Sequence, residues 1–99
     1  MLTITKKIEN GNAVLSPEGR LDTVTAPEME SAIKELIPDI TALTLDFAKL
    51  EYISSAGLRV LLSAQKAMSD RGEMKVINVN ETIMEIFDVT GFSDILTME

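Results

Sequence analysis

Strand-type and helix-type hydrophobic spacing alternate along this chain, and this alternation restricts its fold more than any other feature. A two-residue repeat predicts β-strands near residues 2–8, 12–16 and 43–47, and a short apolar run predicts another at 74–79. A helical repeat predicts helices over residues 25–37, 58–68 and 80–87, with one more short helix over 92–98. This order is typical of an α/β fold in which an N-terminal hairpin opens a mixed central sheet with about four helices. At 99 residues the chain is expected to form one compact domain, 1–99.

Turn residues place the first strand boundaries. Asn10 and Gly11 predict a tight hairpin turn, because both residues tolerate positive φ. The returning strand is expected to end at Pro17 and Gly19, which interrupt the strand pattern.

Capping residues place the helix boundaries. Thr25 is expected to cap the first helix, with Glu28 closing a capping box, and Pro38 is expected to end that helix. Asn80 is expected to cap the last main helix, and Gly91 is a C-terminal stop signal.

Composition excludes several kinds of function. The net charge of −7 and the scattered Lys and Arg residues argue against nucleic-acid binding. The chain has no Cys and no His, which excludes disulfides, the usual zinc sites and a Ser-His-Asp triad. Its acidic residues do not cluster as metal ligands, so neither a metal nor a cofactor is expected. No apolar run reaches the ~20 residues of a membrane span or resembles a signal peptide, so a cytoplasmic protein is expected.

The segment Ser54, Ser55, Ala56 and Gly57 lies between an expected strand and an expected helix. Such a junction exposes unpaired amides at the positive end of the helix dipole, and small residues keep the backbone accessible. The simplest interpretation is a serine N-cap, although one serine can cap while the next is offered to a partner. A Gly-x-Ser-x-Gly motif, a histidine base and a P-loop are all absent, so the chain is not expected to be an enzyme.

Five short motifs, in this order and spacing, resemble the STAS domain, and in particular the stand-alone anti-sigma-factor antagonists of bacteria. The motifs are Gly19–Asp22, Thr25–Glu28, Leu45–Phe47, Tyr52–Leu58 and Ile86–Gly91. The resemblance extends from about Leu2 to about Leu96 and implies a STAS-like fold.

The resemblance also implies a partner-switching cycle. Members of this family bind an anti-sigma factor that is also a serine kinase, and thereby release a sigma factor. The kinase phosphorylates a serine, and a PP2C-type phosphatase removes the phosphate. By position, the phosphorylated serine is Ser55, followed by Ala56 and Gly57, while Ser54 stands where the family commonly has an acidic residue. Ser54 is therefore a second candidate acceptor.

The partner-binding residues implied by the resemblance lie in two neighbouring loops and the following helix: Asp22, Thr23, Ser54, Ser55, Ala56, Gly57 and Arg59. Asp22 can equally open a turn or cap locally, and Arg59 can equally be a solvated helix residue. A free monomer suits a protein that exchanges partners.

Two other functions remain open. The chain could be a non-phosphorylated STAS subunit with a structural docking role in a transporter or a stress-signalling complex. It could also bind a small ligand near Ser55 and Asp22, although no nucleotide-binding motif is present.

Overall fold

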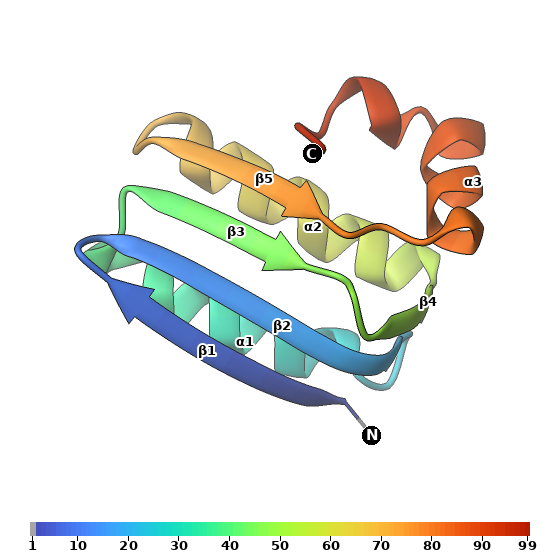
Figure 1. Cartoon of the computed structure of the whole chain (residues 1–99), viewed down its shortest axis with the longest axis horizontal. Helices are drawn as coiled ribbons and strands as arrows, with labels where there is room; N and C mark the ends of the chain where they lie inside the picture. Colours follow the sequence, from blue (N-terminus) through green and yellow to red (C-terminus); the bar gives the residue numbers. More distant parts are fainter. Residues whose placement is uncertain (1) are drawn as a thin grey trace.

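A five-stranded mixed β-sheet forms the centre of the computed structural model, which describes residues 2–99 (Figure 1). Its strands are β1 (Thr3–Glu9), β2 (Asn12–Leu21), β3 (Ala42–Asp46), β4 (Leu50–Ile53) and β5 (Glu73–Ile77). The helices are α1 (Ala26–Leu36), α2 (Ser55–Ser69) and α3 (Glu81–Thr90), with 3₁₀ turns η1 (Ile37–Asp39) and η2 (Phe92–Asp94). Strand β1 is antiparallel to β2, whereas β2 runs parallel to β3 and β4, and β3 runs parallel to β5. The α/β fold expected from the sequence is confirmed.

The hairpin turn lies where the sequence predicts it. Asn10 and Gly11 have φ values of 50° and 81°, as a tight turn between twisted strands requires. The turn fixes the register of β1 on β2, from Glu9 opposite Asn12 to Thr3 opposite Glu18.

Strand β2 is longer than expected, and the prediction that it ends at Pro17 and Gly19 is wrong. It pairs with β3 over residues 12–15 and with β4 over residues 19–21, so buried Pro17 falls between the two partners. A missing N–H is tolerated on that side of β2 because neither β3 nor β4 pairs with Pro17, whose only partner is Ile4 of β1 within residues 2–99. Gly19, at φ 116°, lies at the irregularity where pairing with β4 begins.

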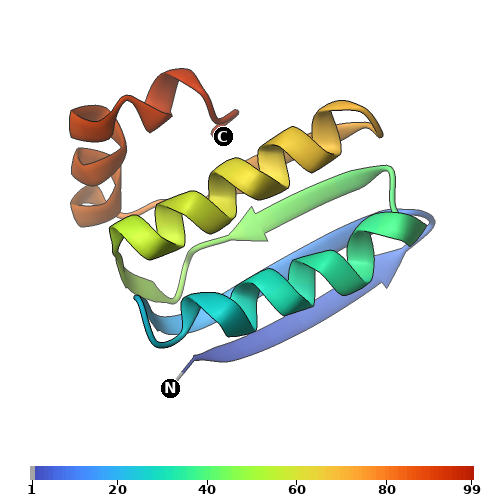
Figure 2. The same ribbon diagram turned by 180° about the vertical axis from the view of Figure 1, so that it is seen from behind.

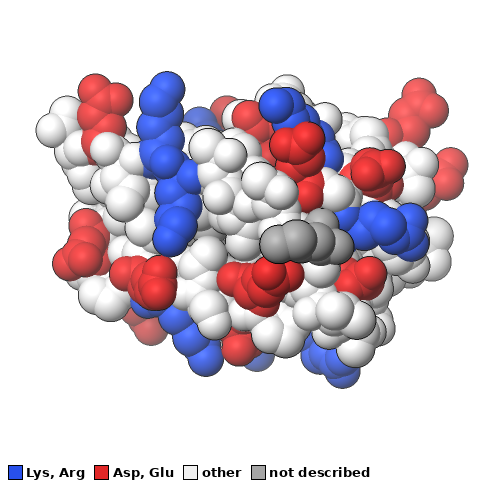
Figure 3. Space-filling model, turned by 90° about the horizontal axis from the view of Figure 1, so that it is seen from below, with Lys and Arg blue, Asp and Glu red and all other residues white. Residues whose placement is uncertain are grey.

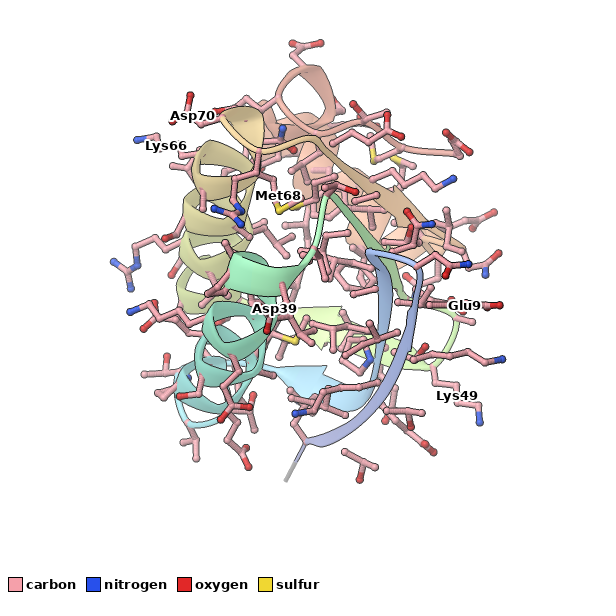
Figure 4. The ribbon with its side chains drawn as sticks, turned by 90° about the vertical axis from the view of Figure 1, so that its left-hand side faces the viewer. Glu9, Asp39, Lys49, Lys66, Met68 and Asp70 are labelled. Carbon is pink, nitrogen blue, oxygen red and sulfur yellow. The ribbon has the colours of Figure 1, made fainter. Side chains whose placement is uncertain are left out.

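Helices α1 and α2 cover one face of the sheet, and no helix within residues 2–99 covers the opposite face of β1, β2 and β3 (Figures 1 and 2). The core lies between these two layers, with Leu15, Leu45 and Phe47 fully buried. At the far end of α2, Met68 turns inward while Lys66 and Asp70 point into solvent (Figure 4).

Helix α3 packs against β4 at the other end of the sheet. Asn80 caps it as predicted, since its side chain accepts a hydrogen bond from the Ile83 amide at 2.8 Å. Gly91, at φ 83°, terminates the helix as predicted.

The short helix expected over residues 92–98 is only the 3₁₀ turn η2. The chain then extends along β5, where the Val76 amide donates to the Thr97 carbonyl and the Glu99 amide donates to the Val76 carbonyl. Met98 thus forms a parallel bridge with Val76. Pairing with the open edge of β5 satisfies backbone groups that a helix would leave at a sheet edge.

Candidate functional site

The carboxyl ends of β2 and β4 bring two sequence-distant loops together. Leu21 lies opposite Ile53 in the parallel pair, and the Ser54 amide donates to the Leu21 carbonyl at 2.8 Å. Residues 22–25 follow the end of β2, and helix α2 follows the end of β4. The structure therefore brings together the two loops in which the sequence predicts partner-binding residues.

Ser55 is the first residue of α2, and it is exposed. The first N–H groups of a helix have no acceptor within that helix, and they carry the positive end of its dipole. The side chain of Ser55 is therefore presented to solvent at an end of the helix that favours negative charge.

Ser54 has the extended backbone of an N-cap residue, but its side chain does not cap the helix. Its Oγ is buried and has no hydrogen-bond partner within residues 2–99. The backbone is instead fixed on both sides, because the amide donates to Leu21 and the carbonyl accepts from the Leu58 amide at 2.9 Å. The expected serine cap is absent because this anchoring leaves the hydroxyl enclosed.

Gly57 allows the start of α2 to lie directly on the sheet. A Cβ at this position would be 2.7 Å from Ile53 Cγ1 and 2.8 Å from Leu21 Cγ, closer than carbon atoms can pack. Gly57 is buried, and Ala56 is half-buried against the core. Of these two expected contact residues, Gly57 therefore positions Ser55 and offers no side chain to a partner.

Asp22 organises the loop that faces Ser54. Its Oδ1 accepts from the amides of Val24 and Thr25, at 3.0 and 3.1 Å. The Thr25 amide is the main reason that the pKa of Asp22 is held below its ordinary value of 3.8. The local capping role left open for Asp22 is thus what the structure contains.

Thr25 does not form the predicted capping box with Glu28. Its Oγ1 accepts from the Asp22 amide at 2.9 Å and donates to the Arg20 carbonyl at 2.8 Å, and it makes no side-chain cap on α1. Thr25 already has helical backbone angles, so its side chain turns back into the loop. Asp22, three residues earlier, accepts hydrogen bonds from the free amides that precede α1.

The loop presents a hydrophobic residue that the sequence analysis missed. Val24 is 82% exposed at the tip of the turn held by Asp22, next to exposed Thr23. An isolated apolar residue between two threonines in a polar turn was the available signal. A hollow of about 370 Å³ lies beside it, lined by Thr23 and Pro27 from the α1 side and by Ala56 and exposed Arg59 from α2.

Charged side chains of both signs are interspersed on the face of the molecule seen in Figure 3. Within residues 2–99, no group of three or more acidic, Cys or His side chains is arranged to hold a metal ion. None of the helices in that range is long and apolar enough to cross a membrane. The site combines the exposed hydroxyl of Ser55 with exposed apolar Val24 and exposed Arg59.

Residues 3–99 match the sequence model of the STAS domain. The chain belongs to the STAS domain family. One relative is the anti-sigma-F factor antagonist RsfB of Mycobacterium tuberculosis, which is 35% identical over 77 residues. That alignment covers 77% of this STAS chain and 63% of the length of RsfB.

Solved structures share the fold. An anti-sigma factor antagonist from Mycobacterium paratuberculosis matches with a TM-score of 0.90 and 25% identity, over 99% of this STAS chain and 85% of that one. The anti-sigma factor antagonist SpoIIAA in its unphosphorylated form matches with a TM-score of 0.84 and 17% identity, over 98% of this chain and 88% of its own. SpoIIAA in the phosphorylated form matches with a TM-score of 0.77 and 17% identity, over 98% of this chain and 91% of its own.

Proposed function

We propose that this STAS domain is an anti-sigma-factor antagonist that acts by binding proteins and has no catalytic role. In its unphosphorylated form it binds an anti-sigma factor that is also a serine kinase, as a monomer in the cytoplasm, and a sigma factor is released. The names of its relatives support this class of function. The observation that carries the proposal is the exposed Ser55 at the first position of α2, beside the loop held by Asp22.

Phosphorylation of Ser55 switches the complex off. A phosphate adds about −1.5 to −2 charges. At this end of the helix the dipole favours such charge by about 0.3–1 kcal/mol, so the fold persists. A partner packed against the unmodified hydroxyl would have to desolvate the phosphate, which is strongly unfavourable. The modification therefore breaks the interface and leaves the domain intact.

Ser55, and not Ser54, is the acceptor. The Oγ of Ser54 is buried behind the start of the helix, whereas Ser55 is exposed. A kinase would need to unfold the first turn of α2 to reach Ser54. A PP2C-type phosphatase restores the binding form by removing the phosphate from Ser55.

The partner contacts the exposed residues around this hydroxyl. Thr23, Val24 and Arg59 are exposed around Ser55, and Val24 supplies apolar area that a bound partner can remove from water. Asp22 and Gly57 contribute by holding the loop and the helix start in place.

Affinity capture from a lysate of the source cells tests the proposal. The baits are the wild type, Ser55→Ala, Ser55→Asp and a matched control, Ser31→Asp, which adds the same charge at an exposed serine of α1. Mass spectrometry is expected to identify an anti-sigma serine kinase with the wild type, Ser55→Ala and Ser31→Asp, and to miss it with Ser55→Asp.

Two results would contradict the proposal. Equal recovery of one partner by all four baits would mean that Ser55 is not a switch and would favour a structural docking subunit. Recovery of an ATPase or a scaffold protein without such a kinase would point to the same alternative.

A further inference from the structure

The C-terminal quarter of the chain carries negative charge without positive charge. Residues 76–99 contain no Lys or Arg. Their acidic residues are Glu81, Glu85, Asp88, Asp94 and Glu99. Glu99 pairs with Lys75 at 3.4 Å, and none of the other four takes part in an ion pair within residues 2–99. Three of these unpaired carboxylates lie on α3.

The same helix exposes apolar surface. Val89 is 87% exposed, and it lines a hollow of about 360 Å³ together with Glu85, Ile86 and Thr90. The Thr90 hydroxyl donates to the Ile86 carbonyl at 2.7 Å, so a protein bound here would not leave that hydroxyl unpaired. A single exposed valine is ordinary on a protein surface, but here the apolar side chains of Ile86 and Val89 share one hollow with the carboxylate of Glu85.

Helix α3 holds this surface rigidly. Ile83 and Phe87 are fully buried on its inner side, and the helix packs against β4. Asn80 and Gly91 close its two ends. A preformed surface loses little conformational entropy when a partner binds.

We infer that the outward face of α3, formed by Glu85, Ile86, Asp88 and Val89, docks a positively charged amphipathic segment of a partner protein. Apolar residues of that segment contact Ile86 and Val89, and its Lys and Arg residues pair with Glu85 and Asp88. Such a segment binds as an amphipathic helix with its apolar side against Ile86 and Val89.

Charge excludes the other occupants of such a face. A second copy of this chain also carries −7, so two α3 faces repel each other. An anionic membrane surface and a nucleic acid repel these carboxylates in the same way. The inference uses no residue of the Ser55 surface and does not depend on the proposed function.

Site-specific photo-crosslinking in the source cells tests the inference, with benzoylphenylalanine placed at Val89 of the full chain. The matched control places the same probe at Ile8, which is 57% exposed on β1 beside Lys6 and Lys7. We expect a crosslinked peptide from Val89 that is amphipathic and rich in Lys and Arg, and no such peptide from Ile8. Reversing the charges with Glu85→Lys and Asp88→Lys should reduce the yield at least tenfold without changing the thermal midpoint.

Three results would overturn the inference. One is the absence of any crosslinked protein at Val89, and another is a crosslinked peptide that has no net positive charge or that comes from a second copy of this chain. The third is an unchanged yield in the charge-reversed variant.

Discussion

The residues that precede helices α2 and α3 have similar backbone angles, but their side chains make different contacts. Ser54 and Asn80 both have extended backbone angles, with ψ values of 178° and 169°, and both belong to residue types that favour N-caps. Asn80 accepts from the Ile83 amide and donates to the Leu50 carbonyl at 2.9 Å, so it caps α3 and ties it to β4. The side chain of Ser54 makes neither kind of contact, since its hydroxyl is buried and has no hydrogen-bond partner among the described residues 2–99.

This difference separates a structural helix start from one suited to a switch. The first turn of α3 is closed by a side chain of its own. The first turn of α2 has no capping side chain from Ser54, so its amides remain suited to an acceptor from elsewhere, such as a phosphate on Ser55. Because Gly57 and the Ser54 amide fix α2 on the sheet, the helix does not need that cap for its position.

The largest expected effect is on binding at the start of α2. Ser55→Asp should weaken the complex with the captured kinase by about 30-fold or more, the range of a central interface residue. Ser31→Asp adds the same charge at an exposed position of α1 and should leave the affinity within about twofold, since an exposed charge outside the contact changes little. Titration calorimetry with the purified partner measures both, and equal losses would show that general charge, and not Ser55, controls binding.

Gly57→Ala should be the most destabilising change at the start of α2. The added Cβ meets Ile53 and Leu21 at under 3 Å, and overpacking of this kind costs about 1–3 kcal/mol. That cost exceeds the gain of about 1 kcal/mol when alanine replaces glycine in a helix. Urea unfolding measures the difference. A variant more stable than the wild type would mean that α2 is not packed so closely on the sheet.

Removing each helix-start side chain should have unequal effects on stability. Asn80→Ala should lower the free energy of unfolding by about 1 kcal/mol, as expected for a lost cap. Ser54→Ala should stay within about 0.5 kcal/mol of the wild type or be slightly more stable, because its hydroxyl makes no hydrogen bond to lose. Equal losses in paired urea titrations would show that both residues act as caps.

The smallest effect concerns the loop beside Ser54. Because the pKa of Asp22 is lowered in the folded protein, its carboxylate stabilises the fold above pH 3.8. That contribution is lost as the pH falls below 3.8 and through the folded pKa. Asp22→Ala should therefore lower the thermal midpoint slightly at neutral pH and by less as the pH falls through the folded pKa of Asp22. Asp22→Asn, which keeps an acceptor oxygen, is the control. A difference in thermal midpoint between the wild type and Asp22→Ala that grows as the pH falls would contradict this role.

Local signals in the sequence predicted most of the fold. Asn10-Gly11, Asn80 and Gly91 act through their own conformational preferences, so their positions could be read without knowledge of distant contacts. Pro17 and Gly19 were misread because β2 exchanges one partner strand for another at that point, which only the tertiary arrangement determines.

The position of the candidate site was predictable from the sequence, but its internal hydrogen bonding was not. Ser55 lies at a strand–helix junction, where small residues and an exposed hydroxyl could be expected. The burial of Ser54 Oγ and the use of Thr25 to close its own loop depend on the adjacent strand ends. The exposure of Val24 follows from the turn that Asp22 holds, so the position of Val24 between two threonines was the available signal in the sequence.

Phosphate mapping tests the central claim most directly. The purified wild type, Ser54→Ala and Ser55→Ala are incubated with the captured kinase and ATP, and peptide mass spectrometry locates the phosphate while gel filtration follows the complex. We predict one phosphate on Ser55 in the wild type and in Ser54→Ala, and none in Ser55→Ala. We also predict that the phosphorylated protein dissociates from the kinase. A phosphate on Ser54, or a complex that survives modification of Ser55, would contradict the account.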